Sequence, residues 1–104
     1  MSAKANIRTS TEGSAQLSGD LTFSTVKELS LEAKALLGAN SRINQLDLAE
    51  VKRVDSSGLA LLLEWQASAL KSGTSLQLVH APADLISLAK LCEAQEFLQL
   101  QSRN

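Results

Sequence analysis

The sequence predicts a single α/β domain in which one mixed β-sheet is covered by helices on one face. Short apolar segments typical of strands alternate along the chain with segments whose apolar residues recur at the spacing of an amphipathic helix. The chain has 104 residues, a length that suits one domain with one core. We therefore expect residues 1–104 to form a single domain.

The composition excludes several classes of protein. Hydrophobic residues make up 44% of the chain and aromatic residues 3%, so the core must be largely aliphatic. The 10 basic and 11 acidic residues are mixed along the chain, and without a basic stripe we expect no direct binding to nucleic acid or to an anionic membrane surface. The single cysteine, Cys92, excludes an internal disulfide. The N-terminus lacks the apolar segment of a signal peptide and no apolar run is long enough to span a membrane, so we expect a cytoplasmic protein.

The first half of the chain carries the signals of two strands and one helix. Residues 6–9 fit a short edge strand, and residues 15–17 fit a strand that should end at the turn signal in residues 18–20. Residues 25–37 have the pattern of an amphipathic helix. Its candidate N-caps are Thr22 and Ser24. Its expected apolar face consists of Val26, Leu29, Ala33, Leu36 and Leu37.

The middle of the chain predicts a strand followed by the longest helix. Residues 43–48 fit the strand, and the charged residues 50–53 fit an exposed connector. Residues 58–71 fit a helix that ends at Gly73, because glycine commonly follows the last helical turn.

The last third predicts one more strand and one more helix. Residues 76–79 fit the strand, with His80 at its end. Pro82 suits the first position of the following helix, where its missing N–H would be unpaired in any residue. The apolar side of that helix should consist of Leu85, Leu88, Ala89 and Cys92, so we expect Cys92 to be a buried small hydrophobe. Residues 93–104 should add a short element packed on the core.

The most informative segment is residues 54–59, which join the middle strand to the long helix. This segment places Ser56 and Ser57 at a helix N-terminus, where unpaired N–H groups favour an oxygen acceptor or an added negative charge. One interpretation is simple N-capping by a serine, and another is a serine switch that is displayed to a partner. Position alone does not choose between them.

The long helix has more apolar surface than burial on one side requires. One expected stripe consists of Leu59, Leu62, Leu63, Ala67 and Leu70. A second stripe, rotated from the first, consists of Leu61 and Trp65. Either the helix is held on two sides within its own domain, or Leu61 and Trp65 belong to a partner-binding patch, in which tryptophan is a favoured anchor.

Catalytic chemistry has little support in the sequence. A serine hydrolase could use Ser56, His80 and one of Asp47, Asp55 or Asp84, but the loop is not a Gly-x-Ser-x-Gly elbow and the chain has one histidine. Asp55 is better explained as a cap of the helix start. The sequence has neither paired metal-ligand spacing nor a phosphate-binding glycine motif. We therefore expect a protein-interaction module without cofactor, metal or enzymatic activity.

The segment Leu-Asp-Leu-Ala-Glu-Val-Lys-Arg-Val-Asp-Ser-Ser-Gly-Leu, residues 46–59, closely resembles the signature of the STAS domain family (sulfate transporter and anti-sigma factor antagonist). Residues 17–21, Leu-Ser-Gly-Asp-Leu, and the order of strands and helices also match that family. The resemblance implies a STAS-like mixed sheet of four to five strands with helices packed on it. It also implies that the loop at Ser56 and the start of the long helix form the exposed recognition surface.

Two subfamilies are compatible with this resemblance. Residues 58–63 and 88–91 resemble the MlaB-like subunits of Mla-type phospholipid-transport ABC complexes. That likeness implies a non-catalytic subunit that binds and regulates the cytoplasmic ATPase subunit (MlaF-like), at the inner membrane, in a system that maintains outer-membrane lipid asymmetry. The alternative is an anti-sigma factor antagonist, in which an anti-sigma factor serine kinase would phosphorylate Ser56.

The expected partner-binding residues lie around the serine loop and the helix that follows it. They are Asp55, Ser56, Ser57, Gly58, Leu61 and Trp65. The expected polar rim consists of Glu50, Lys52, Arg53 and Glu64.

Overall fold

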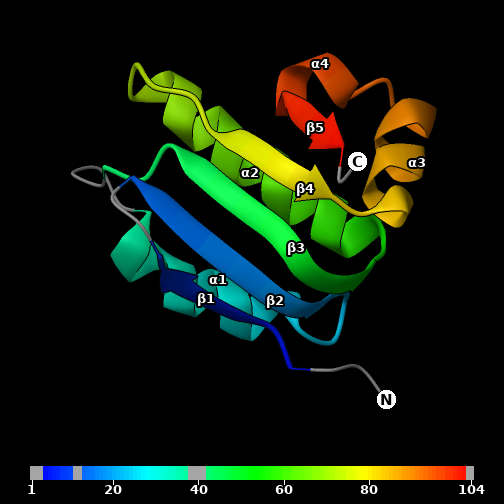
Figure 1. The fold of residues 1–104 in the computed structure, drawn as a ribbon, viewed down its shortest axis with the longest axis horizontal. Coiled ribbons are helices and arrows are strands. Elements are labelled where there is room, and N and C mark those ends of the chain that lie inside the picture. The colour runs from blue at the N-terminus through cyan, green and yellow to red at the C-terminus, as the bar shows by residue number, and fades with distance from the viewer. Residues whose placement is uncertain (1–3, 11–12, 38–41, 103–104) are drawn as a thin grey trace.

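The computed structural model describes residues 4–10, 13–37 and 42–102, which form five strands and four helices (Figure 1). The elements in chain order are β1 (Asn6–Thr9), β2 (Ser14–Leu21), α1 (Val26–Leu36), β3 (Gln45–Val54), α2 (Ser56–Lys71), β4 (Gln77–Ala81), α3 (Ala83–Leu91), α4 (Gln95–Leu98) and β5 (Leu100–Ser102). This alternation of strands and helices confirms the predicted α/β class.

The five strands form one mixed sheet in the order β1-β2-β3-β4-β5. The edge strand β1 runs antiparallel to β2, and the remaining neighbours are parallel. The parallel pairs are joined through helices, as parallel strands require a crossover connection. Because β2 and β3 are parallel neighbours, their carboxyl ends meet at the same edge of the sheet, and the loops that follow them lie side by side.

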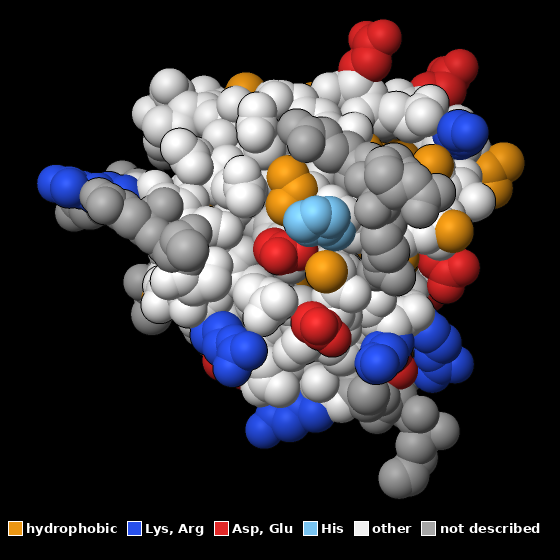
Figure 2. All heavy atoms as spheres, viewed as in Figure 1, with side chains coloured by type: hydrophobic (Ala, Val, Ile, Leu, Met, Phe, Trp, Pro, Cys, Tyr) orange, Lys and Arg blue, Asp and Glu red, His pale blue; other side chains and the backbone are white. Residues whose placement is uncertain are grey.

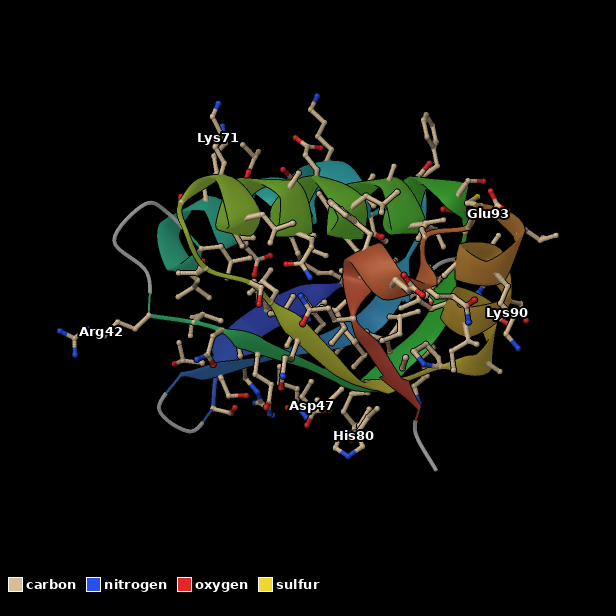
Figure 3. All side chains as sticks on the ribbon, turned by 90° about the horizontal axis from the view of Figure 1, so that it is seen from above. Arg42, Asp47, Lys71, His80, Lys90 and Glu93 are labelled. Carbon is tan, nitrogen blue, oxygen red and sulfur yellow. The ribbon has the colours of Figure 1, made fainter. Side chains whose placement is uncertain are left out.

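One face of the sheet is apolar and is covered by α1 and α2 (Figures 1 and 3). A row of paired residues crosses four strands on this face: Ala15, Leu46, Leu78 and Leu100. The first three are buried and Leu100 is half-buried. Since residues paired across strands point to the same side of a sheet, this row forms the floor of an aliphatic core.

The other face of the sheet carries polar side chains. Here the paired row consists of the polar residues Arg8, Gln16 and Asp47, followed on β4 by the half-buried Val79. His80 Nδ1 lies 3.0 Å from Asp47 Oδ1, and both side chains point away from the helices (Figure 3). Figure 2 shows this face with few hydrophobic side chains at its surface. The expectation that helices cover one face of the sheet is therefore confirmed.

The strands β2 and β3 are both longer than the sequence predicted. The turn signal expected to end β2 at residues 18–20 lies inside the strand, where a register shift against β3 absorbs the irregularity. Gly19 takes φ +87 there, and its missing Cβ leaves room for the carbonyl of Lys4. The charged connector expected at residues 50–53 also belongs to a strand, since β3 continues to Val54 with Val51 buried and Arg53 exposed.

The buried face of α2 differs from the predicted stripe. Leu59 and Leu62 are buried as expected, but Leu70 is exposed. The polar side chain of Gln66 takes the core position instead, because its amide nitrogen donates to the Leu76 carbonyl at 2.8 Å and its amide oxygen accepts the Leu76 N–H at 2.7 Å. The expected stripe residue Ala67 is likewise exposed, and Leu63 is half-buried.

The caps of the shorter helices correct three expectations. The N-cap of α1 is Thr25, and the hydroxyls of Thr22 and Ser24 lie 3.1 Å from each other instead of capping the helix. Pro82 is the N-cap of α3 and not its first helical residue, which is Ala83. Cys92 is exposed at the C-cap of α3, so the expectation that it is buried is wrong. The expected last element is present as α4 and β5, with Leu98 buried.

Within the described ranges, no helix combines the length and the apolar character needed to cross a membrane.

The Gln66 contacts give a prediction about stability. Replacing Gln66 with leucine removes both partners of the Leu76 backbone in a buried site, and each unsatisfied group costs about 1–3 kcal/mol. We expect Gln66→Leu to lower the free energy of unfolding by about 2–4 kcal/mol in urea denaturation. The matched control is Gln77→Leu on the exposed side of β4, which should change it by less than about 0.5 kcal/mol. Equal effects of the two substitutions would contradict this account of Gln66.

Candidate functional site

The candidate site lies where the loops after β2 and β3 meet. Leu21, the last residue of β2, pairs with Val54, the last residue of β3. The Asp55 N–H donates to the Leu21 carbonyl at 3.1 Å, which extends the pairing one residue beyond the strands. Ligand sites of open parallel sheets commonly lie at the carboxyl ends of the strands. We call residues 22–25 and 55–57 the two-loop surface.

Asp55 joins the two loops through one carboxylate. Its Oδ1 accepts the N–H groups of Ser57 at 2.9 Å and of Gly58 at 3.1 Å, so Asp55 is the N-cap of α2. Its Oδ2 accepts the N–H of Phe23 from the other loop at 3.0 Å. The sequence-based expectation that Asp55 caps the helix start is confirmed, and the bond to Phe23 adds a link between loops 32 residues apart in the chain.

Ser56 is the first residue of α2 and is exposed, whereas Ser57 is half-buried. The interpretation that a serine caps the helix is wrong, because Asp55 is the N-cap and Ser56 occupies the position beside it. The carboxylate of Asp55 accepts two of the helix's first N–H groups. The backbone carbonyl of Asp55 accepts a third, that of Leu59, at 3.0 Å. The start of α2 is therefore not an open cradle for an anion. What it offers to solvent is the Ser56 side chain.

Gly58 has a positioning role within this site. It is buried, and a Cβ at this position would collide with the carbonyl oxygen of Leu21 and lie 2.8 Å from the Leu21 Cβ. Only glycine lets the first turn of α2 pass this close to the end of β2. The expectation that Gly58 itself touches a partner is corrected by its burial. It sets the position of its neighbours Ser56 and Ser57.

The loop after β2 is held by the Thr25 hydroxyl. Thr25 Oγ1 donates to the carbonyl of Asp20 at 2.6 Å and accepts the N–H of Thr22 at 3.0 Å. The Thr22 carbonyl in turn accepts the N–H groups of Thr25 and Val26, which starts α1. This tight turn leaves the Phe23 side chain pointing outward, with 82% of its surface exposed.

A shallow hollow of about 400 Å³ lies between the two loops. Its lining residues are Thr22, Phe23, Ser24, Arg53, Val54 and Asp55. The exposed side chain of Arg53 borders the hollow, and its Nη2 lies 3.2 Å from Asp20 Oδ2. Asp20 is buried beneath, so the ion pair fixes the direction of the Arg53 side chain while leaving its charge at the surface.

The second apolar stripe of α2 belongs to the core. Leu61 is only 6% exposed, so the expectation that it lies on a partner-binding patch is wrong. Trp65 is half-buried and packs against the core, where it lines a hollow of about 440 Å³ between α1 and α2. Leu61 is therefore buried within the domain, whereas Trp65 remains partly exposed in the hollow between the two helices. Trp65 also lies nine positions beyond Ser56, roughly 13 Å along the helix axis.

The residues nominated for a hydrolase are not brought together. His80 pairs with Asp47 near the start of β3, while Ser56 follows the other end of that strand. At a rise of about 3.3 Å per residue, the two places lie roughly 20 Å apart. Asp84 is exposed in the first turn of α3. Among the described residues, no group of three or more histidine, cysteine or acidic side chains could hold a metal ion.

Phe23 is the site residue that the sequence analysis missed. The sequence did carry a signal for it. Phe23 is a large aromatic residue between Thr22 and Ser24, in a polar turn where neither the face of a strand nor the face of a helix can bury its side chain. The rim residues expected from the sequence, Glu50, Lys52, Arg53 and Glu64, are all exposed.

Comparisons with known proteins agree with this architecture. A family model described as "Mlab, STAS domain" matches residues 7–100. Among solved structures, the chain is similar to the murine anion transporter Solute Carrier 26 family member A9 in its inward-facing state, with a TM-score of 0.68 and 15% sequence identity. The match covers 94% of this chain and 20% of the transporter chain, so this chain corresponds to a small part of that protein and shares its fold there. No curated protein sequence gives a significant match.

The clamp formed by Asp55 gives a second prediction. Asp55→Ala removes an N-cap, worth about 0.5–2 kcal/mol, and the bond to the Phe23 N–H, worth about 0.5–1.5 kcal/mol. We expect the free energy of unfolding to fall by about 1–3 kcal/mol in urea denaturation. Asp55→Asn, which keeps one acceptor oxygen, should lose less. The control is Asp84→Ala on the first turn of α3, expected to cost below about 1 kcal/mol. An Asp55→Ala cost no larger than this control would refute the clamp.

Gly58 gives a third prediction. Gly58→Ala should destabilise the domain by about 1–3 kcal/mol through the collision with Leu21, although alanine is the better helix former by about 1 kcal/mol. Ser57→Ala, at the neighbouring position, should change stability by less than about 0.5 kcal/mol. Thermal unfolding followed by circular dichroism measures both. If Gly58→Ala proves as stable as the unchanged protein, α2 does not approach β2 as closely as described.

Proposed function

We propose a function that starts from the family of this chain: it belongs to the STAS domain family, whose model matches residues 7–100. The chain is a non-catalytic binding subunit that contacts a partner protein through the two-loop surface. The observation that carries this proposal is the exposed Ser56 side chain on the first turn of α2, whose position is fixed by the Asp55 clamp. A neutral hydroxyl on a fixed backbone can both donate to and accept from a partner's backbone.

The partner that we propose is the cytoplasmic ATPase subunit (MlaF-like) of an Mla-type phospholipid ABC transporter. Two features support it: the description "Mlab" of the matching family model, and the likeness of residues 58–63 and 88–91 to MlaB-like subunits. In this role the chain would be peripheral to the inner membrane through the complex. It would regulate the ATPase and so contribute to outer-membrane lipid asymmetry.

We also propose that the chain is not an enzyme. A hydroxyl nucleophile needs a base within hydrogen-bond reach, and the histidine of this chain, His80, is engaged with Asp47 on the open face of the sheet. The carboxylate beside Ser56 is that of Asp55, whose two oxygens accept three backbone N–H groups. The surface around Ser56 is therefore better suited to recognition than to proton transfer.

A second candidate function is an anti-sigma factor antagonist switched by phosphorylation of Ser56. The exposure of Ser56 at the first turn of a helix favours access by an anti-sigma factor serine kinase. A phosphate there would lie next to the Asp55 carboxylate and would find the N–H groups of Ser57 and Gly58 already occupied. It would thus add negative charge that these two N–H groups cannot bind, and its effect would be to repel a partner that fits the neutral hydroxyl.

Substitutions of Ser56 test this proposal. Ser56→Ala should leave the domain folded and weaken binding to the purified ATPase subunit by about 3- to 10-fold, the worth of one hydrogen bond. Ser56→Asp should weaken it further, because a carboxylate beside Asp55 disturbs a contact made for a hydroxyl. Matched controls are Ser87→Ala and Ser87→Asp on the exposed side of α3. Isothermal titration calorimetry measures all four.

The outcomes separate the two candidate functions. Binding of the ABC ATPase by the unchanged chain, weakened in the Ser56 variants and unchanged in the Ser87 variants, supports the transporter subunit. Phosphate transfer to Ser56 by an anti-sigma factor kinase, with no affinity for the ATPase, supports the antagonist. Binding that is insensitive to every Ser56 variant would leave Ser56 without a recognition role.

A further inference from the structure

Phe23 is a large apolar side chain that is largely exposed on the two-loop surface. The structure describes five large hydrophobic side chains that are exposed: Phe23, Leu31, Leu70, Leu91 and Phe97. Phe23 and Leu91 are the most exposed of these, each at 82%. Of the five, Phe23 alone belongs to the two-loop surface, where it lines the hollow beside Arg53 and Asp55.

We propose that Phe23 is the apolar anchor of the partner contact, and that it inserts into an apolar pocket of the ATPase subunit whose rim carries a carboxylate for Arg53. This inference rests on the proposed function and deepens it, because it states the chemistry that the partner must present. The occupant of the hollow is a segment of that ATPase subunit. The Ser56 hydroxyl supplies a hydrogen bond at the edge of the same contact.

The Asp55 clamp makes Phe23 and Ser56 parts of one surface. The same carboxylate binds the N–H of Phe23 with Oδ2 and caps the helix that begins at Ser56 with Oδ1. The Thr25 hydroxyl holds the Phe23 loop from its other side, by bonding the Asp20 carbonyl and the Thr22 N–H. A side chain on a backbone held in this way loses little conformational freedom on binding, which favours an anchor role.

The hollow offers Arg53 to a carboxylate of the partner, because the acidic side chain in its lining, Asp55, already accepts three backbone N–H groups. The Arg53 side chain is 59% exposed, and its Nε and Nη2 both face a single oxygen, Oδ2 of Asp20, at 3.4 and 3.2 Å. A guanidinium carries five N–H donors in a planar fork, more than one oxygen can use. A carboxylate of the partner can therefore join Arg53 without displacing Asp20. Phenylalanine and arginine are also both enriched in protein–protein interfaces relative to the rest of the protein surface.

The test measures the affinity of the full chain for the purified ATPase subunit by titration calorimetry. We expect Phe23→Ala to weaken binding about 10- to 100-fold, as the loss of one buried aromatic side chain implies. Leu91→Ala is the matched control, since Leu91 has the same exposure but lies at the end of α3. It should bind as the unchanged chain does. Phe23→Leu, which keeps an apolar side chain, should lose less affinity than Phe23→Ala and guards against a folding defect.

A second arm tests the charge. Arg53→Gln, whose side-chain amide can still donate to Asp20, should weaken binding and reduce its dependence on salt, because it removes the charge that attracts the partner's carboxylate. Lys52→Gln, the exposed neighbour on β3, is the control with the same charge change. Equal effects at the two positions would show that Arg53 acts only through overall charge and would overturn that part of the proposal.

Failure of this inference is distinguishable from failure of the proposed function. If the unchanged chain binds the ATPase and Phe23→Ala binds equally well, the anchor is refuted while the function stands. If the unchanged chain does not bind the ATPase, both fall. If sedimentation shows a dimer of the chain that Phe23→Ala dissociates, with ATPase binding unaffected, Phe23 serves a second copy and the anchor role is overturned.

Discussion

The Asp55 carboxylate is the constraint on which the arrangement of the site depends. It accepts one N–H from the loop after β2 and two from the first turn of α2, so it fixes two segments that the sheet alone only brings near each other. Two backbone features make this possible. The parallel pairing of Leu21 with Val54 places the loops side by side, and Gly58 lets α2 start against the end of β2 without a steric clash. The position of Ser56 follows from these contacts.

The two faces of the sheet differ in what they offer to a partner. The covered face is an aliphatic core, and the open face carries a polar row that includes Gln16 and Asp47 and offers few apolar groups to a partner. Parallel sheets are usually covered on both faces, and a polar second face removes the need for a second layer of helices. Phe23 is exposed at the carboxyl edge of the sheet, in the loop that Asp55 ties to the start of α2, where the Ser56 side chain is also exposed.

Sequence periodicity predicted α1 to within one residue at each end, because its apolar face follows a regular helical spacing. It failed at the ends of β2 and β3 for two reasons. Glycine is typical of turns, but Gly19 adopts its positive φ inside a bulged strand. The charged residues before Val54, which suggested a connector, lie on the exposed side of a strand. It also misjudged the buried face of α2, because hydropathy cannot show that Gln66 is satisfied by the backbone of Leu76. The capping role of Asp55 was readable from its place before a helix. The contact with Phe23, 32 residues away, was not, because it arises only from the parallel pairing of the strands.

Amide hydrogen exchange followed by NMR tests the central claim most directly, because it reports each bond to Asp55 separately. The amides to follow are those of Phe23, Ser57 and Gly58, with Leu76, whose N–H is bound by Gln66, as an internal reference in the core. If Asp55 couples the two loops, Asp55→Ala will accelerate exchange at all three amides together while Leu76 keeps its protection relative to global unfolding. Acceleration at Ser57 and Gly58 with Phe23 unchanged would show that Asp55 is an ordinary helix cap and that the two loops are independent.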